Sequence, residues 1–187
     1  TESYILTQPD VLAITETIPQ YNGFQITCFG ASDGKIDLAI SGGSSVNEYA
    51  WTFSLGATDI SATATAQNQN NLGPGTYTVV VTDNNGCTET ESYTLTEPDA
   101  LSLSSTKVDF NGFNISCNGA LDGEIDLIVT GGTSSYTYAW STSNGSGLAL
   151  TAQDQSGLSA GTYTVKVTDT NNCDISDTFT ITQPPPL

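Results

Sequence analysis

The sequence has no histidine, arginine or methionine, and three lysines face 20 acidic residues, which gives a net charge of −17. We expect no nucleic-acid partner, because binding to its phosphates needs clustered lysine or arginine side chains. Serine triads, imidazole acid–base chemistry and phosphoryl clamps all lack their side chains. Paired carboxylates remain as a catalytic option, but the acidic residues fall in turns and at outward strand positions. We therefore expect no enzyme.

Long apolar segments are also missing. No run approaches the ~20 residues that cross a bilayer, so we expect no membrane insertion. No signal peptide is visible either. No stretch has the length and spacing of an amphipathic helix, so the predicted fold class is all-β.

One pattern occurs twice, in residues 72–87 and 158–173. Each copy has a turn, a strand that alternates tyrosine or valine with threonine, and a second turn that ends in cysteine. Alternation with period two predicts a strand with one buried face. Lys166 stands where the first copy has Val80, so that parity of the strand is predicted to face solvent.

The repeat extends over the whole chain with a period of about 90 residues, the size of one small domain. Residues 1–9 resemble residues 90–98, so we assign them to the last strand of a preceding repeat. The predicted domains are 10–98 and 99–187, and the second ends at the start of a further repeat. We expect the chain to be part of a longer array in which neighbouring repeats are partners.

Each repeat contains about seven short strands with turn signals between them, which predicts two tandem immunoglobulin-like β-sandwiches. Asn-Gly between aromatic residues predicts a hairpin at 21–24 and another at 110–113. Weaker strands are predicted at 62–66 and 148–152. The two repeats differ in length within the loop at 52–61, as surface loops tolerate.

The aromatic residues allow two interpretations. Tyr77 and Tyr163 stand where a tyrosine corner is expected, or they are ordinary core aromatics. Trp51 and Trp140 share a strand parity with nearby tyrosines, which favours core packing over a sugar-binding platform. Two further aromatics, Phe53 and Tyr136, lack equivalents in the other repeat and are candidates for the surface.

Each repeat has two cysteines at matching places, one after the predicted hairpin and one after the penultimate strand. We predict one disulfide within each domain, Cys28 with Cys87 and Cys117 with Cys173. Disulfides would indicate an oxidising, extracytoplasmic location. The alternative is four reduced, buried cysteines in a cytosolic protein. Zinc is not expected, because no histidine and no Cys-x-x-Cys pair is present.

Calcium is the metal that the acidic turns could hold, because it takes six to eight oxygen ligands. The predicted disulfides would draw acidic loops together at one end of each sandwich. The candidate ligands of the first repeat are Asp10, Asp33, Asp83 and Asn85, and those of the second are Asp99, Asp122, Asp169 and Asn171. The alternative is that these side chains cap their own turns. The spacing matches no EF-hand loop.

The residues of both copies also resemble a known family. The string Cys-x-Gly-x-x-Asp-Gly-x-Ile-Asp-Leu comes first, followed by Gly-Gly, Tyr-x-Trp and Leu-x-x-Gly-Thr-Tyr-Thr-Val-x-Val-Thr-Asp-x-Asn-x-Cys. Together they resemble the SprB-type repeat of very large surface adhesins in gliding Bacteroidetes. The resemblance implies an extracellular filament of tandem domains at the cell surface, which the gliding machinery carries along and which grips the substratum.

We therefore expect a structural and adhesive repeat segment involved in gliding motility and surface attachment. The alternative is a carbohydrate- or ligand-binding immunoglobulin-like module of a secreted protein. That alternative predicts exposed aromatic or acidic patches on the loops that differ between repeats, 52–61 and 141–147. A spacer predicts that matching positions are confined to core and turns.

Overall fold

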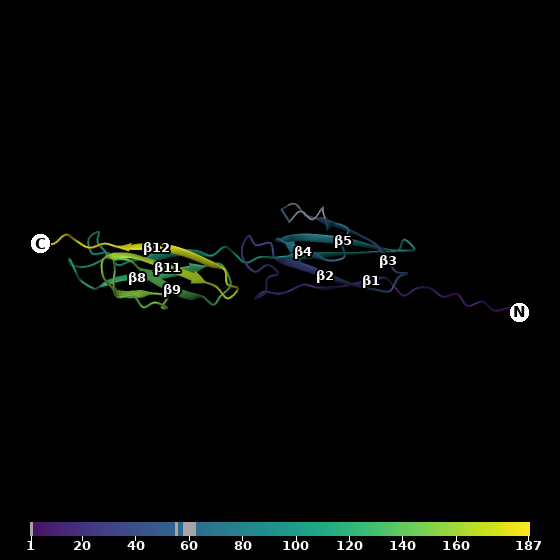
Figure 1. The fold of residues 1–187 in the computed structure, drawn as a ribbon, viewed down its shortest axis with the longest axis horizontal. Coiled ribbons are helices and arrows are strands. Elements are labelled where there is room, and N and C mark those ends of the chain that lie inside the picture. The colour runs from purple at the N-terminus through teal and green to yellow at the C-terminus, as the bar shows by residue number, and fades with distance from the viewer. Residues whose placement is uncertain (1, 55, 58–62) are drawn as a thin grey trace. The chain divides into compact units, whose positions relative to one another are not determined.

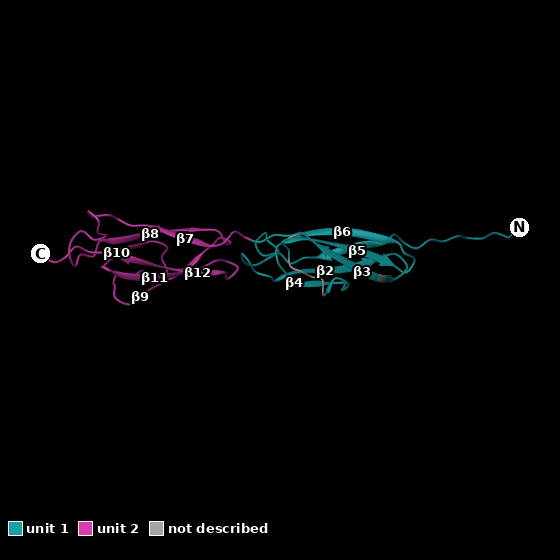
Figure 2. Cartoon of the chain, turned by 90° about the horizontal axis from the view of Figure 1, so that it is seen from above, with its two compact units in different colours: residues 1–97 teal, residues 98–187 magenta. Residues whose placement is uncertain are grey.

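A computed structural model describes residues 2–54, 56–57 and 63–187 (Figure 1). The chain forms two compact units, residues 1–97 and 98–187, which Figure 2 colours separately. Each unit is an all-β, immunoglobulin-like sandwich of two three-stranded sheets. Among the described residues, no helix is long and apolar enough to cross a membrane.

In unit 1, one sheet has the order β1-β2-β4 and the other has the order β3-β5-β6. All pairings are antiparallel. The strands are β1 (Ala13–Thr17), β2 (Gly34–Ser41), β3 (Val46–Phe53), β4 (Gln69–Leu72), β5 (Gly75–Asp83) and β6 (Thr88–Leu95).

Unit 2 repeats this arrangement, with sheets β7-β8-β10 and β9-β11-β12. Its strands are β7 (Ser102–Thr106), β8 (Gly123–Thr130), β9 (Thr137–Thr142), β10 (Gln155–Leu158), β11 (Gly161–Thr168) and β12 (Asp174–Ile181). The same sequence pattern therefore folds twice into the same topology.

The core of each unit lies between its two sheets, as the alternation predicts. On β5 the buried apolar side chains are Tyr77, Val79 and Val81, and on β11 they are the matching Tyr163, Val165 and Val167. The opposite parity faces outward. Lys166 is exposed there, and its ammonium lies 3.3 Å from the Asp174 carboxylate.

Both predicted Asn-Gly hairpins are confirmed. Tyr21 and Phe24 exchange backbone hydrogen bonds of 2.7 and 3.2 Å, and Phe110 and Phe113 form the same bridge. Asn22 has φ of 52° and Gly23 has φ of 95°, so both central residues are left-handed. This is the requirement of a type I′ turn, and it explains why Asn-Gly occupies it.

Among the described residues each unit has six strands, where about seven were predicted. No regular strand follows the hairpin at residues 25–28 or 114–117. The backbone amides of Gln25 and Ile26 instead both donate to the Thr96 carbonyl, each at 3.1 Å. These bonds tie the segment after the hairpin to the last residues of the unit without forming a β-ladder.

The predicted weak strands are displaced toward the C-terminus. Residues 63–68 and 148–152 form turns, and the strands are β4 and β10, which start at Gln69 and Gln155; residue 62 lies outside the described residues. Both glutamines are buried, and their amides bond backbone carbonyls of the preceding turn. Since a buried amide needs such partners, these bonds hold the turn in a non-extended form.

Residues 2–12 form no strand. Their assignment to a preceding repeat, like the predicted boundaries at residues 10 and 99, stays a prediction. A strand of a foreign repeat would need that repeat's sheet as its partner.

Candidate functional site

Each sandwich has two distinct ends. At the entry end of unit 1, the Asp10 carbonyl accepts a 2.8 Å hydrogen bond from the Gly43 amide, and the turn between β5 and β6 lies beside it. At the exit end, the Thr96 carbonyl bonds the segment after the hairpin. The strands run between these two ends (Figure 2), so the chain enters a unit at one end and leaves it at the other.

Asp83 organises the entry end of unit 1. It is buried, and its Oδ1 accepts backbone hydrogen bonds of 2.9 Å from Asn85 and from Cys87. Its Oδ2 accepts the Ser44 amide at 3.0 Å, from the turn between β2 and β3. These amides, with that of Cys87 foremost, lower the pKa of Asp83 below its ordinary value of 3.8.

Asp169 repeats this arrangement in unit 2. Its Oδ1 accepts the amides of Asn171 and Cys173 at 2.9 Å. Its Oδ2 accepts the amide of Thr133 at 2.9 Å and the hydroxyl of Thr133 at 3.0 Å. Each carboxylate thus closes its own turn and ties it to the neighbouring one.

Aspartates also organise the exit ends. Asp33 accepts the backbone amide and the hydroxyl of Thr27, and Asp122 accepts the same two groups from Ser116. In unit 1, the Gly30 amide donates to the Glu97 carboxylate. The exit-end loop is thereby fastened to the last residues of the unit.

The candidate calcium ligands are divided between these two ends. Asp10, Asp83 and Asn85 belong to the entry end, whereas Asp33 belongs to the exit end. Unit 2 is divided in the same way, with Asp99, Asp169 and Asn171 at one end and Asp122 at the other. The premise that both acidic loops meet is therefore wrong. Within the described part of the chain, no group of three or more metal-binding side chains occurs, and whether calcium binds stays a prediction.

The predicted disulfide pairing is also wrong. Cys87 and Cys117 are free, exposed thiols, so neither Cys28–Cys87 nor Cys117–Cys173 is formed. The reason is the length of the sandwich. Cys28 lies at the exit end and Cys87 at the entry end, with the 8-residue β6 between these ends. At about 3.3 Å per residue this separation is roughly 25 Å, whereas a disulfide needs Cα atoms within ~7 Å.

The disulfide-bonded cysteines are Cys28 and Cys173. Cys28 is the exit-end cysteine of unit 1, and Cys173 is the entry-end cysteine of unit 2. Each unit therefore keeps one free thiol, Cys87 at an entry end and Cys117 at an exit end. Sequence reasoning found the four residues but paired them wrongly, because strand direction cannot be read from spacing.

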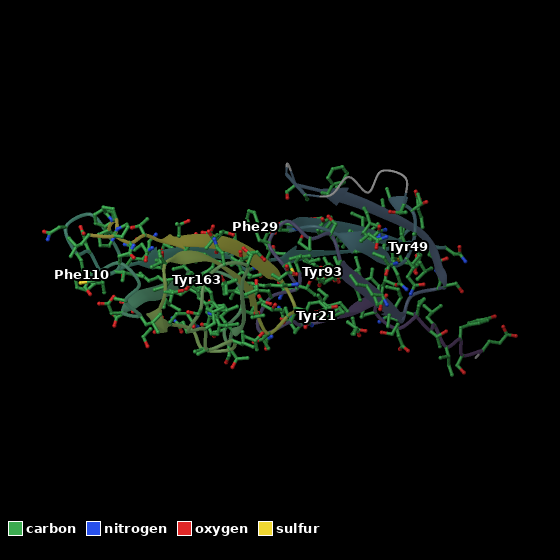
Figure 3. The ribbon with its side chains drawn as sticks, turned by 60° about the vertical axis from the view of Figure 1, so that its left-hand side comes forward. Tyr21, Phe29, Tyr49, Tyr93, Phe110 and Tyr163 are labelled. Atoms are coloured by element: carbon green, nitrogen blue, oxygen red, sulfur yellow. The ribbon has the colours of Figure 1, made fainter. Side chains whose placement is uncertain are left out.

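The tyrosine corner is present in both units. The Tyr77 hydroxyl donates to the Gly73 carbonyl at 3.0 Å, four residues upstream. Tyr163 (Figure 3) makes the equivalent bond to Ser159 at 2.8 Å, and its hydroxyl also accepts the Ser146 amide at 3.1 Å. Both rings are fully buried, so these side chains link core packing to the turn before the strand.

The tryptophans belong to the core, which supports the packing interpretation over a sugar platform. Trp51 and Trp140 are each 4% exposed. Their indole nitrogens donate to the carbonyls of Ala66 and Ala152, both at 2.8 Å. Phe53 is 38% exposed, as expected for a surface candidate.

The other surface candidate, Tyr136, is half-buried. It packs against the core of unit 2, and its hydroxyl donates to the Gly131 carbonyl at 2.6 Å. Residues 55 and 58–61 of the variable loop at 52–61 lie outside the described residues.

Sequence reasoning missed the two buried glutamines. Gln69 and the Trp51 indole both donate to the Ala66 carbonyl, and Gln155 and Trp140 share the Ala152 carbonyl in the same way. The signal was available, because both repeats carry Gln-x-Gln at the same place, at 67–69 and 153–155.

A known protein family matches part of each unit. The family model of the SprB repeat matches residues 25–54 and 113–145, one region in each unit. No curated protein matches the sequence.

A solved structure resembles the chain weakly. It is the crystal structure of a C-terminal 282-residue fragment of intimin in complex with the intimin-binding domain of the translocated intimin receptor. The identity is 14% and the TM-score 0.43, over 95% of this chain and 64% of the other. The chain thus spans less than two thirds of that structure, and at this similarity no property of intimin transfers to it.

Proposed function

We propose that this chain, which carries two SprB repeats, is a tension-transmitting segment of a large cell-surface adhesin involved in gliding motility and surface attachment. The proposed role is extracellular and non-catalytic. The segment would extend a filament whose neighbouring repeats are its nearest partners. The substratum or a surface polysaccharide would be the more distant one.

The observation that carries this proposal is the path of the chain through each sandwich. In unit 1 the chain enters β1 at Ala13, which pairs with Ser41 at the entry end. It leaves β6 at Leu95, which pairs with Gly75 at the exit end. A pull on the two ends of the unit therefore acts along the strands.

Strand direction decides how such a pull is resisted. The ladder bonds of an antiparallel sheet lie perpendicular to the strands, so a pull along them loads all bonds of a pair together. In unit 1 the terminal strands β1 and β6 belong to different sheets and are each held by a full-length neighbour. Unit 2 has the same arrangement, with β7 and β12 as its terminal strands.

The side chains at the two ends support the same role. The entry-end and exit-end aspartates tie adjacent turns to each other through backbone amides, and both units keep these bonds. This structural use of the aspartates explains why they recur in both repeats, and it requires no catalytic function. The excess negative charge would keep neighbouring filaments apart.

An antibody raised against the folded chain tests the proposed location and function. We expect it to label intact, unpermeabilised cells of the source organism and to slow their movement over a surface. The monovalent Fab fragment is the matched control, because it binds the same surface but cannot cross-link two chains as the bivalent antibody does. Labelling that appears only after permeabilisation would contradict the proposal.

A glycan array with the purified chain separates the spacer from a ligand-binding module. The spacer predicts no saturable binding, because the tryptophans that could form a platform are buried. Reproducible binding to one class of sugar would show that this segment itself makes the adhesive contact.

A further inference from the structure

The two free thiols occupy related positions. Cys87 follows the turn between β5 and β6 and lines a surface pocket of about 360 Å³ at the entry end of unit 1, together with Asp10, Leu12 and Gly43. Cys117 lines a surface pocket of about 410 Å³ at the exit end of unit 2, together with Ser116, Asn118 and residues 184–187. Both thiols are exposed.

Their equivalents in the other unit show what such cysteines do. Cys173 matches Cys87, and the backbone of each bonds the aspartate at the end of the penultimate strand in the same way. Cys28 matches Cys117, and the carbonyl of each accepts the amide three residues later, at 3.0 and 3.1 Å. Both equivalents are disulfide-bonded.

The bonded cysteines therefore include one of each kind, an exit-end cysteine and an entry-end cysteine. The two kinds cannot pair within a unit, because the length of the sandwich separates them. Cys28 lies in the loop fastened to Glu97, and Cys173 lies beside the turn that binds the Asp99 carbonyl through Gly132.

We propose that Cys87 and Cys117 are complementary halves of a disulfide between repeats, and that the partner of each is a further copy of this repeat. An exit-end cysteine such as Cys117 bonds the entry-end cysteine of the copy that follows it. An entry-end cysteine such as Cys87 bonds the exit-end cysteine of the copy before it. This inference rests on the proposed filament and adds covalent bonds along it.

The covalent step is thiol–disulfide exchange with a small dissolved disulfide such as oxidised glutathione. The Cys87 thiolate attacks one glutathione sulfur, forms a mixed disulfide and releases one reduced glutathione. The Cys117 thiolate of another copy then attacks the Cys87 sulfur and releases the second. Two protein thiols lose two electrons and two protons, and one oxidised glutathione becomes two reduced molecules.

The test uses two single variants, Cys87→Ser and Cys117→Ser, with oxidised glutathione as the oxidant. Each variant alone keeps one kind of free thiol, so we expect each to stay monomeric on a non-reducing gel. A mixture of the two is expected to give a covalent dimer, and the unmodified chain a ladder of longer species. Dimers in the single variants as abundant as in the mixture would overturn the proposal, as would the absence of dimer in the mixture.

Peptide mapping identifies the bond. Cleavage after glutamate, except before proline, places the four cysteines in four different peptides, 17–48, 49–89, 92–124 and 125–187. We expect new disulfides to join 49–89 to 92–124. Peptides joined to their own kind in equal amount would indicate random pairing and contradict complementary ends.

Failure of this inference can be told apart from failure of the proposed function. Tension along the strands can be measured under reducing conditions, where no disulfide contributes. A spacer without complementary thiols would resist tension under reducing conditions but would form no covalent dimer in the mixture of the two variants.

Discussion

Replacing Asp169 with alanine tests whether the acidic turns are structural. The carboxylate is 5% exposed and accepts three backbone amides and one hydroxyl from two separate turns. Alanine removes every one of these acceptors while leaving the strands intact. The matched control is Asp126→Ala, which removes the same charge from an exposed position of β8.

The size of the expected loss in the free energy of unfolding depends on which hydrogen-bond donors stay buried. Thr133 is 5% exposed, so its amide and hydroxyl lose their partner without gaining water. A buried donor left unsatisfied costs about 1–3 kcal/mol. Asn171 and Cys173 are half-buried, so water replaces part of their lost bonds. We expect Asp169→Ala to lower the free energy of unfolding of unit 2 by about 3 kcal/mol, and Asp126→Ala by less than about 0.5 kcal/mol.

Urea unfolding followed by tryptophan fluorescence measures this difference. Each unit contains one tryptophan, so a Trp51→Phe background leaves Trp140 as the reporter of unit 2. The fitted midpoint and slope give the free energy of unfolding of that unit. A loss below about 1 kcal/mol, or a loss equal to that of the control, would refute a structural role for the carboxylate.

Three further predictions concern single groups. Tyr93 has a buried hydroxyl without a hydrogen-bond partner, and burial, aided by nearby glutamates, raises its pKa to about 12. The pKa of an unfolded tyrosine is near 10, so stability should fall as pH rises from 10 to 12. In pH-dependent melts Tyr93→Phe should reduce this fall, and the remainder comes from Tyr49 and Tyr138, whose pKa burial also raises. The variant should lose no stability at neutral pH, since unit 2 carries Phe179 at this place, and an unchanged fall would contradict the prediction. Tyr163→Phe should cost about 0.5–1.5 kcal/mol in urea unfolding, because the bonds of its hydroxyl to the Ser146 and Ser159 carbonyls are lost, whereas the Ser146 amide keeps the Ser159 hydroxyl as an acceptor. A loss no larger than that of Tyr93→Phe would contradict this. Calcium is tested by melts in EDTA and in 1 mM calcium: a site with a Kd near 10 μM would add ~2.7 kcal/mol, and identical melts would leave the aspartates as turn-formers.

Much of the fold could be predicted because the relevant signals are local. Tyr77, Val79 and Val81 alternate with outward residues, and the swap of Val80 for Lys166 marked the exposed face of the strand. Asn-Gly specified its hairpin through positive φ. Comparison of the two halves then showed that the same domain occurs twice.

What could not be predicted depends on long-range geometry. The spacing of Cys28 and Cys87 is compatible with a bond, but strand direction places them at opposite ends of the sandwich. The same separation divides Asp33 from Asp83. Gln69 could not be placed in a core from propensity alone, because its burial depends on carbonyls that become available only when the preceding turn folds.

The most direct test of the account is the force needed to unfold the chain when it is pulled from its two termini under reducing conditions. We expect two unfolding events, each releasing roughly 300 Å of chain for about 90 residues. The control attaches the handles to unit 1 at Ser45 and Asn84, whose backbones share a 3.0 Å hydrogen bond at the entry end. That geometry opens the β3–β5 ladder one bond at a time. A clearly higher force in the terminal geometry is the predicted result, and equal forces in the two geometries would contradict a tension-transmitting role.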